Sequence, residues 1–213
     1  GVSWIDFDLD GDLDLYVAQF GYPNVLYENR GESQFVEVAA TVGIADDGLS
    51  TSGAWGDYDA DGDLDVYVVN HRQADRLYRN VDGRFSDRGS AFGLDDDGAG
   101  IGAGWVDWDS DGDLDLSLTR YGETDQLYDN NGRAEGRRFD DIGPRVRLDD
   151  RGQGQMTLWG DYDLDGDVDA YVVNGGDGKD ISRLYRQDRD SFRNVSSATG
   201  LVGRTTGAAR QAK

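Results

Sequence analysis

One unit of about 50 residues occurs four times in the chain. Its most regular part is a ten-residue segment with aspartate at every odd position, and the first copy is DFDLDGDLDL at residues 6–15. The other copies are DYDADGDLDV from residue 57, DWDSDGDLDL from 107 and DYDLDGDVDA from 161, which gives spacings of 51, 50 and 54 residues. A repeat of this length is typical of propellers and other repeat folds, in which neighbouring units bury one another's apolar faces.

Within each unit, apolar residues alternate with a period of two, which indicates β-strands. In the second unit SGAWGDY precedes the aspartates, LDVYVVN follows them, and DRLYRN and GRFSDRG come next. Val66 and Val68 are therefore expected on one face of the second strand, with Tyr67 and Val69 on the other. Four short strands per unit predict an all-β chain, a β-propeller built of four-stranded blades.

Aromatic and leucine residues recur at fixed places in the units and are expected to form the core of the blades. They are Trp4, Trp55, Trp105 and Trp159; Leu26-Tyr27, Leu77-Tyr78, Leu127-Tyr128 and Leu184-Tyr185; and Phe35, Phe85, Phe139 and Phe192. The predicted single repeat domain has blades at about 1–47, 48–97, 98–151 and 152–203, with 204–213 a tail or the start of a degenerate unit. Four blades can form a small closed ring, a part of a larger propeller, or half of a ring closed by two chains.

The formal net charge of −22 argues against nucleic acid or an anionic membrane as a partner. Cysteine is absent, so the chain has neither disulfides nor thiol chemistry. No apolar run is long enough to cross a bilayer, and no signal peptide is present. Because the chain begins with Gly1 rather than Met, we expect a mature or excised piece of a longer, secreted protein.

Alternating carboxylates around a central glycine supply the oxygen ligands that a hard divalent cation requires. Ca²⁺ accepts about six to eight oxygens in a flexible geometry, and the glycine permits a sharp turn. An EF-hand would need glutamate at position 12 of the loop, where this chain has Val17, Val68, Leu118 and Val172. The ninth-position aspartate is therefore expected to close the site at the start of the next strand.

Calcium is favoured over zinc because the loops contain no His or Cys, and over magnesium because Mg²⁺ demands a tight octahedron. A solvated acidic turn without metal is the alternative for a single loop. Four loops in register, each with glycine at the sixth position, favour about four bound Ca²⁺ ions.

The loop D-x-D-x-D-G-D-x-D-L, with GAWGDYD before it and RLYRN…F after it, resembles the FG-GAP/VCBS-type repeat over nearly the whole chain. That repeat builds calcium-binding β-propellers similar to the N-terminal head of integrin α chains. The resemblance implies that the side chains at positions 1, 3, 5 and 9 bind calcium together with the backbone carbonyl at position 7. The implied side-chain ligands are Asp6, Asp8, Asp10 and Asp14; Asp57, Asp59, Asp61 and Asp65; Asp107, Asp109, Asp111 and Asp115; and Asp161, Asp163, Asp165 and Asp169.

The chain departs from that family in two respects. Position 7 is itself an aspartate, whose carboxylate is expected to face solvent or a bound water: Asp12, Asp63, Asp113 and Asp167. Integrin-type heads have seven blades, whereas this chain has four units, so the closure of the ring stays open.

The predicted function is that of an extracellular binding or adhesion module for protein or glycan partners, in which calcium is structural. A subunit of a surface layer or filament, formed by self-assembly, is the alternative, and a lyase or hydrolase is the least expected class. His71 is the single histidine, and the chain has no G-x-S-x-G, H-E-x-x-H or P-loop motif.

Partner binding is expected where the units differ most, in the loops after the second strand: QFGYPN, NHRQAD, RYGETD and NGGDGKDIS. Ordinary variation of surface loops is the alternative. The candidate residues are Tyr22, His71, Arg72, Arg120, Tyr121 and Lys179.

Overall fold

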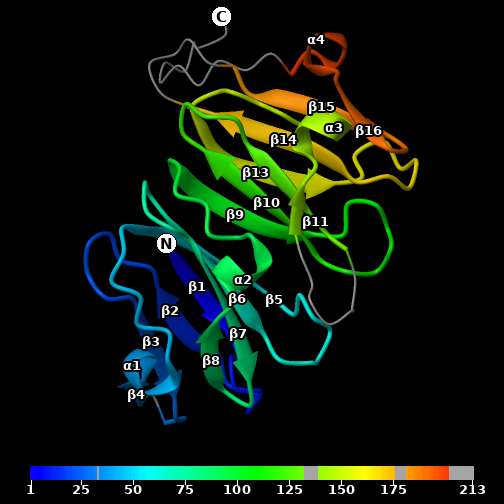
Figure 1. Ribbon diagram of the computed structural model, residues 1–213. Coiled ribbons are helices and arrows are strands. Elements are labelled where there is room, and N and C mark those ends of the chain that lie inside the picture. Colours follow the sequence, from blue (N-terminus) through cyan, green and yellow to red (C-terminus); the bar gives the residue numbers. More distant parts are fainter. Residues whose placement is uncertain (33, 132–138, 176–180, 202–213) are drawn as a thin grey trace, which may run out of the picture.

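The computed structural model describes residues 1–32, 34–131, 139–175 and 181–201. Lys179 and the expected tail at 204–213 lie outside these residues. In the described part, sixteen β-strands form four separate antiparallel sheets, each built from four strands that are consecutive in the sequence. The sheets follow one another in space in the order of the chain, with the first and the fourth at the two ends of the series (Figure 1). The predicted all-β chain of four-stranded, propeller-like blades is confirmed.

Each strand pairs with the strand that follows it in its own sheet. The first sheet contains β1 (Val2–Ile5), β2 (Asp14–Val17), β3 (Val25–Asn29) and β4 (Phe35–Glu37). The second contains β5 (Ser50–Gly56), β6 (Asp65–Asn70), β7 (Arg76–Val81) and β8 (Arg84–Asp87). The third contains β9 (Gly100–Val106), β10 (Asp115–Arg120), β11 (Gln126–Asn130) and β12 (Phe139–Asp141). The fourth contains β13 (Gly154–Gly160), β14 (Asp169–Asn174), β15 (Arg183–Asp188) and β16 (Ser191–Asn194).

A single helical turn follows the last strand of each sheet, which the sequence analysis did not anticipate. These turns are α1 (Ala39–Val42), α2 (Gly89–Phe92), α3 (Gly143–Val146) and α4 (Ser196–Thr199). Each is followed by a residue in the left-handed conformation, which is glycine in three cases and Arg147 after α3. Four residues are too few to produce a helical periodicity in the sequence. No helix in the described residues is long and apolar enough to cross a membrane.

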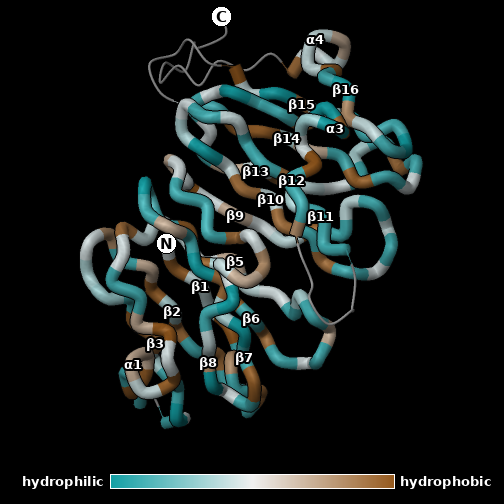
Figure 2. Tube along the Cα trace, in the orientation of Figure 1, coloured by the Kyte–Doolittle hydropathy of each residue, from teal (hydrophilic) through white to brown (hydrophobic). Residues whose placement is uncertain are grey.

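The apolar core lies between successive sheets. Apolar residues gather along the strands whereas the peripheral loops are hydrophilic (Figure 2). All residues of β6 are buried, because the second sheet has a neighbouring sheet on both faces. Val66 and Val68 pack toward the first sheet, and Tyr67 and Val69 toward the third, as the alternation predicted.

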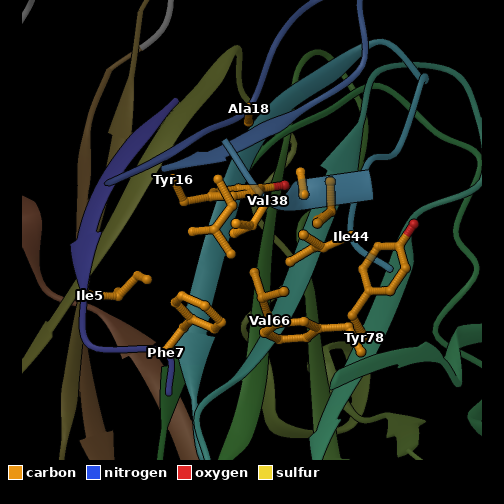
Figure 3. Packing of buried hydrophobic residues seen from close by; sticks show 12 residues of the cluster. Ile5, Phe7, Tyr16, Ala18, Val38, Ile44, Val66 and Tyr78 are labelled. Atoms are coloured by element: carbon orange, nitrogen blue, oxygen red, sulfur yellow. The ribbon is translucent and has the colours of Figure 1, made fainter. Parts of the chain in front are cut away.

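The cluster between the first and second sheets illustrates how two neighbouring units meet. Phe7 and Tyr16 of the first unit point into the same space as Val66 and Tyr78 of the second (Figure 3). The rings of Phe7 and Phe85 lie 6.2 Å apart, and those of Tyr16 and Trp55 lie 5.3 Å apart at an interplanar angle of 79°. Aromatic contacts of this kind add to the free energy gained by burying apolar surface.

Two of the residues expected in the blade core are exposed instead. Trp4 and Phe35 both lie largely open to solvent, and their rings contact each other at 6.3 Å. The prediction was wrong for these two because no described sheet packs against that face of the first sheet (Figure 1).

Candidate metal centres

Each aspartate loop connects the first strand of a sheet to the second. The ninth-position aspartate is the first residue of β2, β6, β10 or β14. It therefore lies at the start of the outgoing strand, as predicted from the sequence.

The first aspartate of each loop organises the turn by accepting two backbone hydrogen bonds. Its two carboxylate oxygens accept the N–H groups of positions 5 and 6 over 3.0–3.2 Å, and this pattern is the same in all four loops. The carboxylate at position 5 accepts the N–H of position 7 over 2.9–3.1 Å. The backbone thus wraps around the side chains at positions 1 and 5.

Two positions of each loop adopt positive φ. The glycine at position 6 has φ between 92° and 101°, where a Cβ would be strained. Position 4 is also left-handed, with φ between 52° and 61°, although it is never glycine: Leu9, Ala60, Ser110 and Leu164. The sequence carried no signal for this second position, because Leu, Ala and Ser have no preference for that conformation.

The ninth-position aspartate is buried and fastens three segments together. In the second loop, Asp65 accepts the N–H of Tyr58 from the loop (3.2 Å) and that of Asn80 from the third strand (2.8 Å). The same two bonds occur in the other units. Burial, as the largest cause, raises the pKa of this carboxyl to about 6 in Asp14, to about 8 in Asp65 and Asp115, and upward in Asp169. A cation in the loop would favour the ionised form.

Carboxylate oxygens converge in every loop. In each case oxygens from three different aspartates lie within 4.8 Å of one another. The groups are Asp6, Asp8 and Asp10; Asp57, Asp59 and Asp61; Asp107, Asp109 and Asp115; and Asp161, Asp163 and Asp169. All these donors are hard anionic oxygens, so the residues fit a hard divalent cation and not a soft metal.

The carboxylate at position 7 accepts a backbone hydrogen bond near the surface in two of the loops. Asp63 accepts the N–H of Asp82 over 2.8 Å, and Asp167 accepts the N–H of Arg189 over 3.0 Å. Both donors belong to the tight turn between the third and fourth strands. That turn lies beside the aspartate loop because both connections are at the same end of the sheet.

One third-strand residue next to each loop differs in charge between units, and the sequence analysis missed it. In the second unit, Arg79 pairs with Asp59 and Asp61, both over 2.8 Å. In the fourth, Arg186 lies 3.5 Å from Asp163. The matching residues of the first and third units are acidic: Glu28 and Asp129.

The acidic side chains at these matching positions add negative charge beside the loop carboxylates, whereas the arginines add positive charge. Burial and then neighbouring carboxylates raise the pKa of Asp8, Glu28 being one of them. The pKa of Asp109 is raised in the same way, with Asp129 among the causes. The four loops therefore have one geometry but two electrostatic environments.

The candidate partner-binding residues lie at the other end of the second strand from the aspartate loops. Tyr22, Arg72 and Tyr121 are exposed, while His71 and Arg120 are half-buried. These loops contact the start of the next unit through the bridges His71↔Ala99 and Tyr121↔Gln153.

Arg120 is held in place by acidic neighbours. It pairs with Asp96 over 3.4 Å and with Glu123. Its role in the described residues is to join the loop of the third unit to the segment that precedes it.

The profile of the FG-GAP-like repeat matches the chain twice, at residues 6–68 and 57–118. Together the matches cover residues 6–118, just over half of the chain, so the chain belongs to the FG-GAP-like repeat family. No curated protein matches it.

Among solved structures, the chain is similar to the biofilm matrix protein Bap1 of V. cholerae, with a TM-score of 0.49 and 15% identity. The similarity covers 90% of this chain and 29% of that one, so this chain spans less than a third of Bap1.

Proposed function

We propose that this chain is a calcium-stabilised, propeller-type module that binds protein or glycan partners outside the cell, and that calcium is structural rather than catalytic. The observation that carries the proposal is the fourfold repetition of one loop geometry in which anionic oxygens converge. Membership of the FG-GAP-like repeat family supports a binding module over an enzyme.

The proposed ligands are those that the family pattern assigns. Each ion would be held by the side chains at positions 1, 3, 5 and 9 and by the carbonyl of position 7. The convergence of positions 1, 3 and 5 in two loops and of 1, 3 and 9 in the other two is consistent with this set. Both oxygens of the ninth-position aspartate accept backbone hydrogen bonds. Because a carboxylate has about four lone-pair sites, it can still bind the ion.

A structural role for the ion follows from the strands that each aspartate loop holds together. The loop holds the first, second and third strands through backbone hydrogen bonds to its carboxylates. An ion that binds the folded loop and not the unfolded chain adds its binding free energy to stability. Millimolar calcium outside the cell would saturate even weak sites of this kind.

Binding of a partner is assigned to the variable loops, since the aspartate loops repeat and cannot confer specificity. Tyr22 and Tyr121 supply exposed aromatic surface, and Arg72 supplies a cation. Aromatic and arginine side chains dominate the binding energy of many interfaces.

Calcium removal tests the proposal. Addition of EGTA should lower the melting temperature sharply, and restoring Ca²⁺ should recover it, whereas Mg²⁺ at the same concentration should recover little. Isothermal titration should give about four ions per chain. A melting temperature that EGTA leaves unchanged would refute the calcium assignment.

A further inference from the structure

A tyrosine of the second strand is replaced by serine in the third unit. The residue two positions after the ninth-position aspartate is Ser117 there, and in the other units it is Tyr16, Tyr67 and Tyr171. Tyr16 and Tyr67 are completely buried, and each packs in the interface between its own sheet and the next one. The interface between the third and fourth sheets therefore lacks a phenol ring that the first two interfaces contain.

The hydroxyl of Tyr67 satisfies a buried carboxylate next to the third strand of its sheet. It donates to Oδ2 of Asp75 over 2.7 Å, and Oδ1 of Asp75 accepts the backbone N–H of Asn70. The counterpart in the third unit is Asp125, whose Oδ1 accepts the backbone N–H of Arg120 over 2.7 Å. Asp125 is 7% exposed, and its Oδ2 has no hydrogen-bond partner among the described residues. A buried polar atom that is left unpaired costs free energy, so this oxygen requires a donor.

A cavity of about 80 Å³ lies beside Ser117, where β9 and β10 face β13 (Figure 1). Gly104 pairs with Ser117 in the third sheet, whereas Ala54 pairs with Tyr67 in the second. The loss of side-chain volume on this face of the third sheet therefore accounts for the cavity. Its walls are Gly102, Ala103, Gly104, Ser117, Thr119, Met156 and Thr157.

The walls of the cavity are polar enough to hold water. Three of the wall residues carry hydroxyl groups, and those of Thr119 and Thr157 hydrogen-bond each other over 2.9 Å. The indole N–H of Trp159, on the same face of β13 as Thr157, is buried without a partner in the described part of the chain. The matching indole N–H of Trp105 donates to the carbonyl of Ala54 over 3.0 Å. Since one water occupies about 30 Å³ and empty cavities are generally apolar, this cavity has both the room and the polarity for water.

We infer that this cavity binds about two water molecules in the place of the missing phenol ring. One of them donates a hydrogen bond to Oδ2 of Asp125, as the hydroxyl of Tyr67 does to Asp75, and the other bonds to the hydroxyl groups of the walls. Tyr67 spans the distance from the second strand to Asp75, and the cavity begins at Ser117, the matching point of the third sheet. An apolar cavity of about 150 Å³ binds benzene, so a smaller and polar one selects water over an aromatic ligand.

A high-resolution crystal structure of the wild type tests the inference directly. It should show ordered water within about 3 Å of Oδ2 of Asp125 and in the cavity beside Ser117. A dry cavity, or an Oδ2 that meets a protein donor instead of water, would overturn the inference. The test does not depend on the assignment of calcium, because none of these residues is a proposed ligand.

Transfer of the second interface into the third should expel the water. The triple variant Ser117→Tyr/Thr119→Val/Thr157→Ala gives the third interface the residues that the second one has as Tyr67, Val69 and Ala103. Its matched control is Thr119→Val/Thr157→Ala, which lacks only the phenol. Circular dichroism melts establish that both variants fold.

Magnetic relaxation dispersion of the solvent counts the long-lived internal waters of each variant. The triple variant should hold about two fewer than the control, because the tyrosine fills the cavity and its hydroxyl donates to Asp125. It should also melt at a higher temperature than the control, since a filled cavity is more stable than an open one. Equal numbers of long-lived waters in the two folded variants would count decisively against the site.

Discussion

The guanidinium of Arg79 lies 2.8 Å from the carboxylate of Asp59, one of the proposed cation ligands of the second aspartate loop. It also lies 2.8 Å from Asp61. Arg186 approaches Asp163 of the fourth loop, whereas the first and third loops have Glu28 and Asp129 in the same place. In the proposed assignment, calcium would displace or tolerate a positive charge at two of the four loops.

We therefore predict two classes of calcium site, a tighter pair in the first and third units and a weaker pair in the second and fourth. Arg79→Glu should move one site from the weaker to the tighter class, with a gain of about tenfold in affinity, and Glu28→Arg should do the reverse. Isothermal titration of Ca²⁺ measures both changes. A single affinity for all four sites in the wild type would contradict the prediction.

Asp65→Asn should destabilise the fold by about 1–3 kcal/mol in EGTA at about pH 9, where the Asp65 carboxyl, whose pKa is raised to about 8, is ionised. Asp65 accepts two backbone N–H groups in a buried site, and an asparagine amide can accept only one while its NH₂ faces the other donor. Asp63→Asn is the control, because Asp63 accepts one N–H through Oδ2 and sits nearer the surface. Urea unfolding in EGTA should separate the two variants, and equal losses would count against the anchoring role of the ninth position.

Gly62→Ala should cost about 1–2 kcal/mol because Gly62 has φ of 101°, which a residue with a Cβ adopts only with strain. The added methyl would meet no atom within 4 Å, so the loss would be conformational. Gly104→Ala is the matched control, since Gly104 has equal space around a Cβ and no positive φ. Thermal melts should show a loss for the first variant and little change or a small gain for the second.

The stability contributed by Asp75 should fall as pH rises. This carboxyl is buried, accepts the hydroxyl of Tyr67 over 2.7 Å, and has its pKa raised by burial to about 8. Between about pH 4 and pH 8 the folded chain retains a proton that the unfolded chain has lost, so the free energy of unfolding decreases with pH.

Asp75→Asn removes this titration and keeps the shape of the side chain. The wild type should lose stability relative to the variant between pH 4 and pH 8, with a slope of at most about 1.4 kcal/mol per pH unit. Urea unfolding of both proteins across this range gives the slope. A difference that does not change with pH would show that Asp75 is ionised in the folded state.

The blades were predictable from the sequence because their determinants are local. The alternation of Val66, Tyr67, Val68 and Val69 defines a strand with two buried faces, and the structure places these side chains on opposite sides as expected. The position of Asp65 at the start of the outgoing strand was also predicted. The apolar residue at position 12 excluded an EF-hand, which left the ninth-position aspartate to close the site.

The remaining features depend on contacts between distant parts of the chain. Trp4 and Phe35 carry the sequence signature of core residues, and only the absence of a described neighbouring sheet leaves them exposed. The pairing of Arg79 with Asp59 requires the third strand to lie beside the aspartate loop, which spacing along the chain does not reveal. Such contacts can be identified only from the three-dimensional arrangement of the sheets.

The side-chain amide of Asn80 joins two neighbouring aspartate loops. Its nitrogen donates both to the carbonyl of Phe7 in the first aspartate loop and to that of Leu64 in the second (3.1 Å). Asn130 connects the second and third loops in the same way. An event that fixes the backbone of one of these three loops therefore restricts the backbone of the next, and an ion bound in one of them, as proposed, is expected to lower the ordering cost at its neighbours.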